Sequence, residues 1–104
     1  MVSIEIQRNS EDQVIGCHLS GHAGYDEHGF DMVCAAVSAL SATAMLGLTQ
    51  IAQQEWEYTN IEGQCDMVLS GTINHSGQDI LGTMILGLKE ISRQYPEFVQ
   101  IHEI

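Results

Sequence analysis

Basic residues are scarce in this sequence: three lysines and arginines stand against 14 aspartates and glutamates, for a formal net charge of −11. A surface with this balance repels the phosphates of nucleic acids and anionic membranes and attracts cationic partners. The charge therefore argues against direct binding of nucleic acid or of a membrane. It is compatible with a basic polypeptide partner and equally with a role in solubility alone.

Cysteine is also scarce, and its number is odd. Three cysteines cannot all pair within one chain, which excludes a complete disulfide framework. The opening M-V-S-I-E-I lacks the basic, apolar and cleavage-site succession of a secretory signal peptide. The longest uncharged run, residues 32–54, contains serines, threonines and glutamines and has no flanking lysine or arginine, so it favours a buried helix over a membrane span. We therefore expect a protein of the reducing cytoplasm.

A hydrophobic content of 44% in 104 residues predicts one globular domain, residues 1–104. Apolar periodicity and turn residues divide this domain into seven elements. The pattern predicts strands at residues 2–6, 14–20, 55–61, 64–73 and 98–104, and helices at residues 32–52 and 77–95. Val2, Ile4 and Ile6 form the inward face of the first strand, and a capping-box variant at residues 76–79 indicates Ser76 as the cap of the second helix. The first helix is apolar on most sides, so we expect the sheet and a second subunit or helix to cover it on most sides. The order β-β-α-β-β-α-β predicts an α+β fold, a single compact domain with two helices packed on a mixed sheet. The order of the strands in that sheet does not follow from the pattern.

Cys34 is the candidate nucleophile. Asp31 is a good N-cap for the helix 32–52 and would place Cys34 at the third helical position. Unpaired N–H groups and the helix dipole in that turn favour a thiolate and stabilise an oxyanion. Cys17 and Cys65 lie at inward positions of predicted strands, which indicates core residues.

His22 is the candidate partner of this thiol. It lies between Gly21 and Gly24, where the strand 14–20 ends and a loop, residues 23–30, leads to the helix. Successive elements are usually adjacent in space, which brings an imidazole within reach of Cys34. A Cys/His pair performs acyl transfer, with the imidazole as general base and then general acid. No third member of a triad is identifiable, so we expect a dyad. The glycines of the loop are compatible with a lid over the site and with an ordinary connection.

Two segments carry a family resemblance: G-H-A-G-Y at residues 21–25 and G-F-D-M-V-C-A-A-V-S-A-L at residues 29–40. They resemble the signature of the Prp family, the ribosomal-processing cysteine proteases of bacteria such as Firmicutes, and the likeness covers essentially the whole chain. It implies that His22 and Cys34 are catalytic and that Gly21, Asp31 and Ser38 are supporting or substrate-binding positions, with no metal and no cofactor.

The resemblance also implies a substrate and an assembly. The family removes the N-terminal extension of large-subunit ribosomal protein twenty-seven during ribosome assembly, and its members are cytoplasmic homodimers. Cleavage is expected after paired aromatic residues. The chain departs from the family pattern at Asp26 and Met32, where a small residue and a branched aliphatic residue are expected. Neither departure affects the proposed chemistry.

Three other functions fit parts of the pattern. A metal site is suggested by the cluster Cys17, His18, His22, His28 and Cys34, although its spacing matches no common metal motif. A redox sensor is suggested by a low-pKa thiol, although no resolving cysteine lies near Cys34 in sequence. An acidic, non-catalytic ribosome-assembly binding module is the third alternative.

Overall fold

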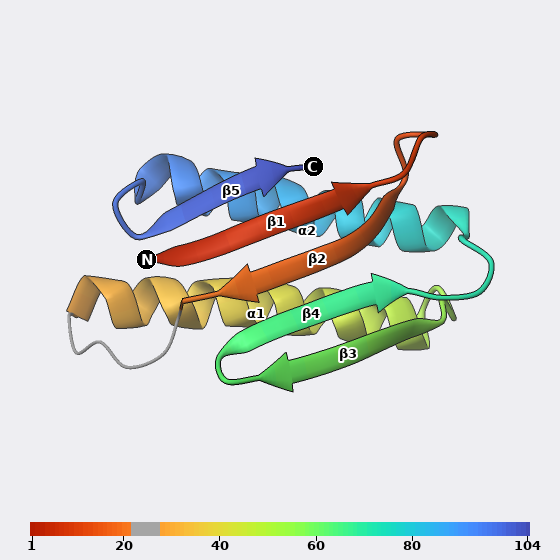
Figure 1. The fold of residues 1–104 in the computed structure, drawn as a ribbon, viewed down its shortest axis with the longest axis horizontal. Helices are drawn as coiled ribbons and strands as arrows, with labels where there is room; N and C mark the ends of the chain where they lie inside the picture. Colours follow the sequence, from red (N-terminus) through yellow and green to blue (C-terminus); the bar gives the residue numbers. More distant parts are fainter. Residues whose placement is uncertain (22–27) are drawn as a thin grey trace.

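The computed structural model describes the backbone of residues 1–21 and 28–104 and the side chains of residues 1–21 and 32–104. The elements follow the predicted order β-β-α-β-β-α-β (Figure 1). They are β1 (Val2–Arg8), β2 (Val14–Ser20), α1 (His28–Gln50), β3 (Trp56–Ile61), β4 (Gln64–Leu69), α2 (His75–Gln94) and β5 (Val99–Glu103).

The five strands form one mixed sheet in the order β3-β4-β2-β1-β5. β1 pairs antiparallel with β2, β2 with β4 and β4 with β3, whereas β5 pairs parallel with β1. Both helices lie on the same face of this sheet (Figure 1). The predicted α+β fold is confirmed, and the strand order leaves β3 and β5 as the two edges.

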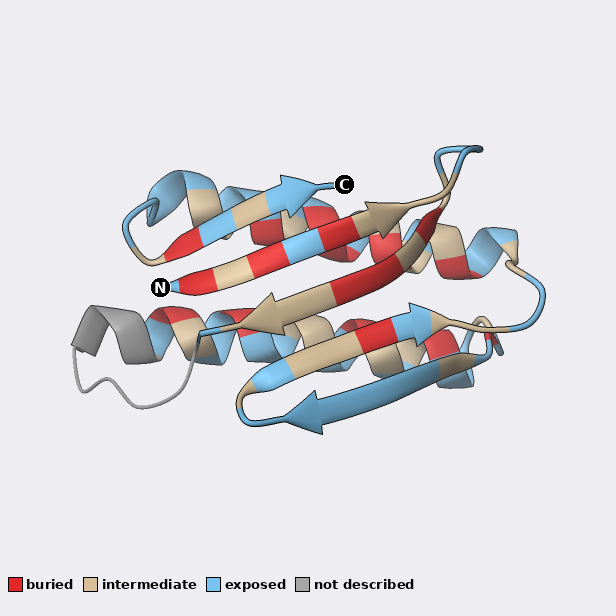
Figure 2. Ribbon diagram, in the orientation of Figure 1, coloured by how far each residue is buried: buried red, intermediate tan, exposed pale blue. Residues whose placement is uncertain are grey.

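The core lies between the sheet and the helices (Figure 2). The alternation in β1 is confirmed, since Val2, Ile4 and Ile6 are each 0% exposed. Leu48 of α1 and Leu88 of α2 are equally buried against them. Full burial of such a side chain contributes about 1.5–3 kcal/mol, so this apolar layer holds the helices on the sheet.

The predicted strand 64–73 is too long, because β4 ends at Leu69. Gly71 has a φ of +65°, and the buried side chain of Gln54 binds the carbonyl oxygens of Ser70 and Thr72 at 3.2 and 3.1 Å. The chain therefore turns away from the sheet after Leu69.

The predicted start of the second helix is also wrong. Asn74, not Ser76, is the N-cap of α2, and its Oδ1 accepts from the Gly77 N–H at 2.7 Å. Asn74 is held there by Gln54 Oε1, which accepts its backbone N–H at 2.9 Å, and by the Ala52 carbonyl, which accepts from Nδ2 at 2.9 Å. Both residues are good N-caps, so the tertiary contacts decide between them.

The first helix keeps one face uncovered. Its segment Met32–Gln50 is long and apolar enough to span a membrane by length and composition, with a mean hydropathy of 1.8. Its inward residues Val33, Val37 and Leu48 belong to the core, but only 22% of the segment is buried. The prediction that this helix is covered on most sides is therefore not met by the single chain.

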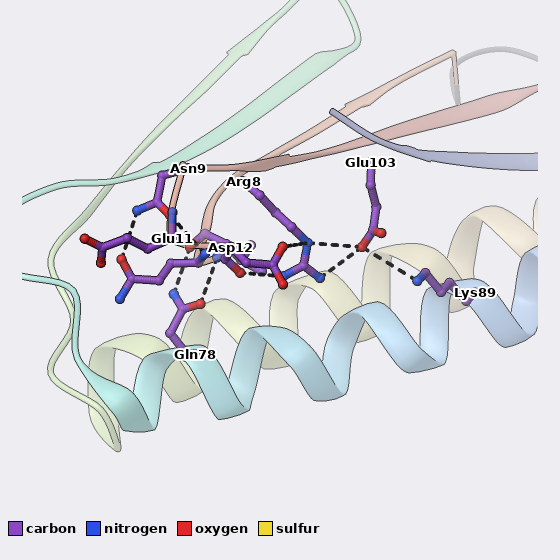
Figure 3. Close-up of polar contacts among 9 residues, drawn as sticks. Arg8, Asn9, Glu11, Asp12, Gln78, Lys89 and Glu103 are labelled. Atoms are coloured by element: carbon purple, nitrogen blue, oxygen red, sulfur yellow. Dashed lines mark hydrogen bonds and ion pairs between the residues drawn. The ribbon is translucent and has the colours of Figure 1, made fainter.

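The three cationic side chains all lie beside carboxylates. Arg8 donates to Glu103 Oε1 at 2.9 Å, and Lys89 Nζ lies 3.6 Å from the same oxygen (Figure 3). Arg93 lies 2.7 Å from Glu90 Oε2. The pKa of Glu103 is lowered, chiefly by the hydrogen bond from Arg8. Because the few positive charges are neutralised locally, the rest of the surface is acidic.

Candidate active site

The structure places Cys34 inside α1 and not in its first turn. The helix begins at His28, so Cys34 is its seventh residue, and Asp31 lies within the helix instead of capping it. A carboxylate in the first turn is favoured by the helix dipole, which explains why Asp31 does not stop the helix. The prediction that unpaired first-turn N–H groups activate the Cys34 thiol is therefore wrong, because such groups belong to the first four residues only.

Cys34 lines a cavity between α1 and the sheet. This Cys34 cavity has a volume of about 380 Å³ and is mostly apolar. Cys34 and Ser38 lie one turn apart on the α1 wall, Leu19 is on the β2 wall, and Trp56 and Tyr58 are on the β3 wall. Cys34 is half-buried and Ser38 is exposed, so the thiol has a surface route through the cavity.

The other two cysteines face the same cavity. Cys17 is 1% exposed, and burial raises the pKa of its thiol to about 12, so it stays a neutral core residue as predicted. Cys65 is half-buried in the cavity wall and not fully in the core. Its side chain hydrogen-bonds Tyr58, and this contact is the largest cause of the raised pKa of that phenol. Of the three thiols, Cys34 is the one that combines access with a position on a helix.

His22 and the expected lid belong to a part of the chain outside the described residues. The loop is shorter than the predicted residues 23–30, because α1 already includes residues 28–30. At its start, Gly21 has a φ of +85°, and a Cβ there would overlap the backbone oxygen of Met1. A larger residue does not fit this position, so the structure explains why a glycine directly follows β2.

Comparison with known proteins identifies the family. The family described as cysteine protease Prp matches residues 1–100 of the chain. This chain belongs to the Prp family of cysteine proteases. The ribosomal processing cysteine protease Prp of Staphylococcus aureus strain Mu50 is 32% identical to it over 105 residues, which cover 98% of each chain.

Solved Prp structures share the whole fold. A ribosomal processing protease Prp from S. aureus in complex with a substrate peptide matches with a TM-score of 0.93 and 25% identity, over 100% of both chains. A second structure of S. aureus Prp, with a covalently linked product peptide, matches with a TM-score of 0.89 and 26% identity, again over 100% of both chains. The arrangement of sheet and helices described above is therefore that of the Prp fold.

The alternative metal site is not assembled by the part of this Prp chain that the structure describes. Cys17 faces the Cys34 cavity, whereas His18 lies on the opposite face of the sheet. There His18 Nδ1 is 2.7 Å from Asp66 Oδ1, and Nε2 is 3.2 Å from Gln7 Oε1. Neighbouring strand residues point to opposite faces, so these two donors do not converge.

Proposed function

We propose that this Prp protein removes the N-terminal extension of large-subunit ribosomal protein twenty-seven, with Cys34 as nucleophile and His22 as general base and acid. The observation that carries the proposal is the position of Cys34: it is half-buried on the wall of an apolar cavity large enough for a substrate side chain. The S. aureus relatives support it, because one binds a substrate peptide and another carries a covalently linked product peptide.

The chemistry follows from a thiol and an imidazole. The Cys34 sulfur, after losing its proton to His22, attacks the carbonyl carbon of the scissile peptide bond. The C–N bond breaks as His22 returns the proton to the leaving amine, which leaves a thioester. Water, deprotonated by His22, then hydrolyses the thioester and releases the thiol. The covalently linked product peptide in an S. aureus relative fits such an intermediate.

The structure also bears on the roles proposed for His22, Ser38 and Asp31. Leu19, near the end of β2, shares the cavity with Cys34, and His22 follows three residues later in the sequence. Ser38 is exposed and lines the same cavity one helical turn after Cys34, which supports a role of its hydroxyl in binding substrate or His22. Because Asp31 lies inside α1, its role is to favour the helix start by its charge.

The charge of the protein suits this substrate. Ribosomal proteins are basic, and a net charge of −11 attracts a cationic polypeptide and speeds its association. RNA and membranes are not part of the proposal, since an acidic surface repels their phosphates. We place the activity in the cytoplasm, which is reducing enough for three thiols and is the site of ribosome assembly.

We further propose that the protein is a homodimer. An apolar groove of about 690 Å³ runs between α1 and α2 on the side away from the sheet. Large apolar side chains lie exposed on these helices, with Leu46 at 59% and Leu86 at 70% exposure, and Ile51, directly after α1, is 76% exposed. Exposed apolar patches of this kind mark interaction sites. Light scattering is expected to give twice the chain mass of 11.4 kDa, and a monomer at micromolar concentration would refute the proposal.

The protease activity is tested with the natural substrate. Purified protein is incubated with the organism's own ribosomal protein carrying its N-terminal extension, and the products are weighed by mass spectrometry. We expect one cut that releases the extension and leaves the rest of the ribosomal protein intact. An uncleaved ribosomal protein, bound or not, would contradict the proposal and favour the binding module.

A further inference from the structure

The β3 edge of the sheet is open to an additional strand. β3 is the first strand in the sheet order and pairs with β4 on one side. Five of its six residues are exposed, and Trp56 alone is half-buried. An edge of this kind presents backbone donors and acceptors that another extended chain can pair with.

The register shows which backbone groups of β3 face outward. Ile61 and Gln64 flank a two-residue turn, Glu62-Gly63, with φ values of 50° and 83°. This geometry belongs to a type I′ hairpin, whose flanking residues form a hydrogen-bonded pair. At the other end of the hairpin, the Ser70 N–H donates to the Glu55 carbonyl at 3.0 Å.

Both ends of the hairpin give the same alternation. In an antiparallel pair, every second residue directs both its N–H and its C=O towards the partner strand. Residues 55, 57, 59 and 61 of the β3 segment therefore bond to β4. It follows that the backbone groups of Trp56, Tyr58 and Asn60 point away from the sheet.

The same three residues carry side chains that line the Cys34 cavity. β3 runs antiparallel to α1 (Figure 1), and Trp56 Nε1 donates to Thr49 Oγ1 at 2.9 Å near the C-terminal end of that helix. The α1 wall of the cavity extends from Cys34 to Met45. Eleven helical steps of 1.5 Å make this wall about 16 Å long, which matches roughly five residues of an extended chain.

We propose that β3 binds the peptide substrate as an added edge strand, with the backbone of Tyr58 and Asn60 pairing to the substrate chain beside its scissile bond. This inference rests on the proposed protease function and specifies how the substrate is held. Alternate side chains of the paired segment enter the apolar Cys34 cavity, and the intervening ones face solvent. Backbone pairing supplies affinity for any extended sequence, whereas the cavity selects apolar residues at every second position.

Charge favours a substrate over a second copy of this chain at the edge. Glu55, Glu57 and Glu62 are exposed along β3 and its turn. Two β3 strands pairing with each other would oppose these like charges, which destabilises the pair. A basic polypeptide instead complements them. The edge is thus protected against self-association and open to the proposed substrate.

The proposal is tested with a series of substrate peptides, each methylated at one backbone amide within five residues of the scissile bond. Methylation removes one donor, so positions that pair with β3 are expected to raise KM about ten-fold or more, and those between them to leave KM near that of the unmodified peptide. The expected pattern is a rise in KM at every second methylated position on one side of the scissile bond. Equal sensitivity at every position, or at none, overturns the proposal. Cleavage of the unmodified peptide separates this outcome from a failure of the proposed function.

A matched pair of variants tests the protein side. Asn60→Pro removes the outward N–H together with the side chain, and Asn60→Ala removes only the side chain. Proline is tolerated at such an edge position because no β4 bond is lost. We expect Asn60→Pro to raise KM at least several-fold above Asn60→Ala. Equal KM values for two folded variants would contradict the pairing, and the methylated peptides decide the question if Asn60→Pro does not fold.

Discussion

Replacing Cys34 with serine is expected to lower kcat/KM for peptide cleavage by at least about 10³-fold, with the fall in kcat and not in substrate affinity. A serine hydroxyl is a much weaker nucleophile than a thiol unless a base is placed to activate it, and loss of a nucleophile is among the most costly changes in an acyl-transfer enzyme. Cys34 is half-buried and tolerates an isosteric oxygen, so the fold is expected to remain. The measurement is steady-state kinetics on the peptide substrate, with circular dichroism as a check of folding.

Cys65→Ser is the matched control for this change. Cys65 lines the same cavity and is half-buried like Cys34, but it lies on β4 and not on the α1 wall. We expect the Cys65 variant to keep kcat within a few-fold of the starting protein. Full activity of the Cys34 variant would remove the proposed mechanism, and retained biological function without cleavage would favour the non-catalytic binding module. Cys17 is a poorer control, because a hydroxyl at a site 1% exposed would also disturb the core.

Replacing Gln54 with alanine is expected to destabilise the protein by about 3 kcal/mol. The side chain is 3% exposed, and it forms hydrogen bonds both to the segment that leads into β3 and to the segment between β4 and α2. Its Nε2 lies 3.1 to 3.2 Å from the carbonyl oxygens of Glu55, Ser70 and Thr72, and its Oε1 accepts the Asn74 N–H at 2.9 Å. The variant removes the donor to the Ser70 and Thr72 carbonyls and the acceptor of the Asn74 N–H, whereas the Glu55 carbonyl keeps its bond from the Ser70 N–H. Each lost bond costs about 1–3 kcal/mol where water cannot reach the backbone group.

Thermal unfolding measures this effect. For a domain of this size, 1 kcal/mol corresponds to roughly 4–8 °C in Tm, so a fall of more than about 10 °C is expected. Gln50→Ala is the control, because Gln50 is an exposed glutamine at the end of α1 and its loss is expected to change Tm by less than about 3 °C. Similar Tm values for the two variants would show that water or a local rearrangement replaces the bonds of Gln54.

The corrected start of α1 changes what would activate Cys34, the proposed nucleophile. If Cys34 stood in the first turn, the helix dipole and unpaired amides would lower its pKa without help. At the seventh position of α1 that effect has decayed. The proposal therefore assigns the activation of Cys34 to His22 and not to the helix start, and in a His22→Ala variant the helix terminus would not replace the lost imidazole.

The two errors at helix starts have a common physical cause. Asp31 and Ser76 are both residue types that often cap helices. The residue type alone does not show whether such a residue is the N-cap in the folded protein. In α2 the choice was made by Gln54, twenty residues away from Asn74, through a hydrogen bond to its backbone. In α1 the residues before Asp31 continue the helix instead of forming a loop.

By itself, the sequence determined the element order, the inward face of β1, the burial of Cys17 and the excess of acidic residues. The element order and the inward positions follow from the spacing of apolar residues two to four positions apart, and the acidity follows from composition, so all of them can be read from the chain. Only the tertiary structure decided the strand order, the cavity shared by three thiols, the role of Gln54 and the outward backbone of Tyr58 and Asn60. Each of these arises from contacts between segments that are distant in sequence. Many such contacts are possible for one sequence, and the packing of the whole chain selects among them.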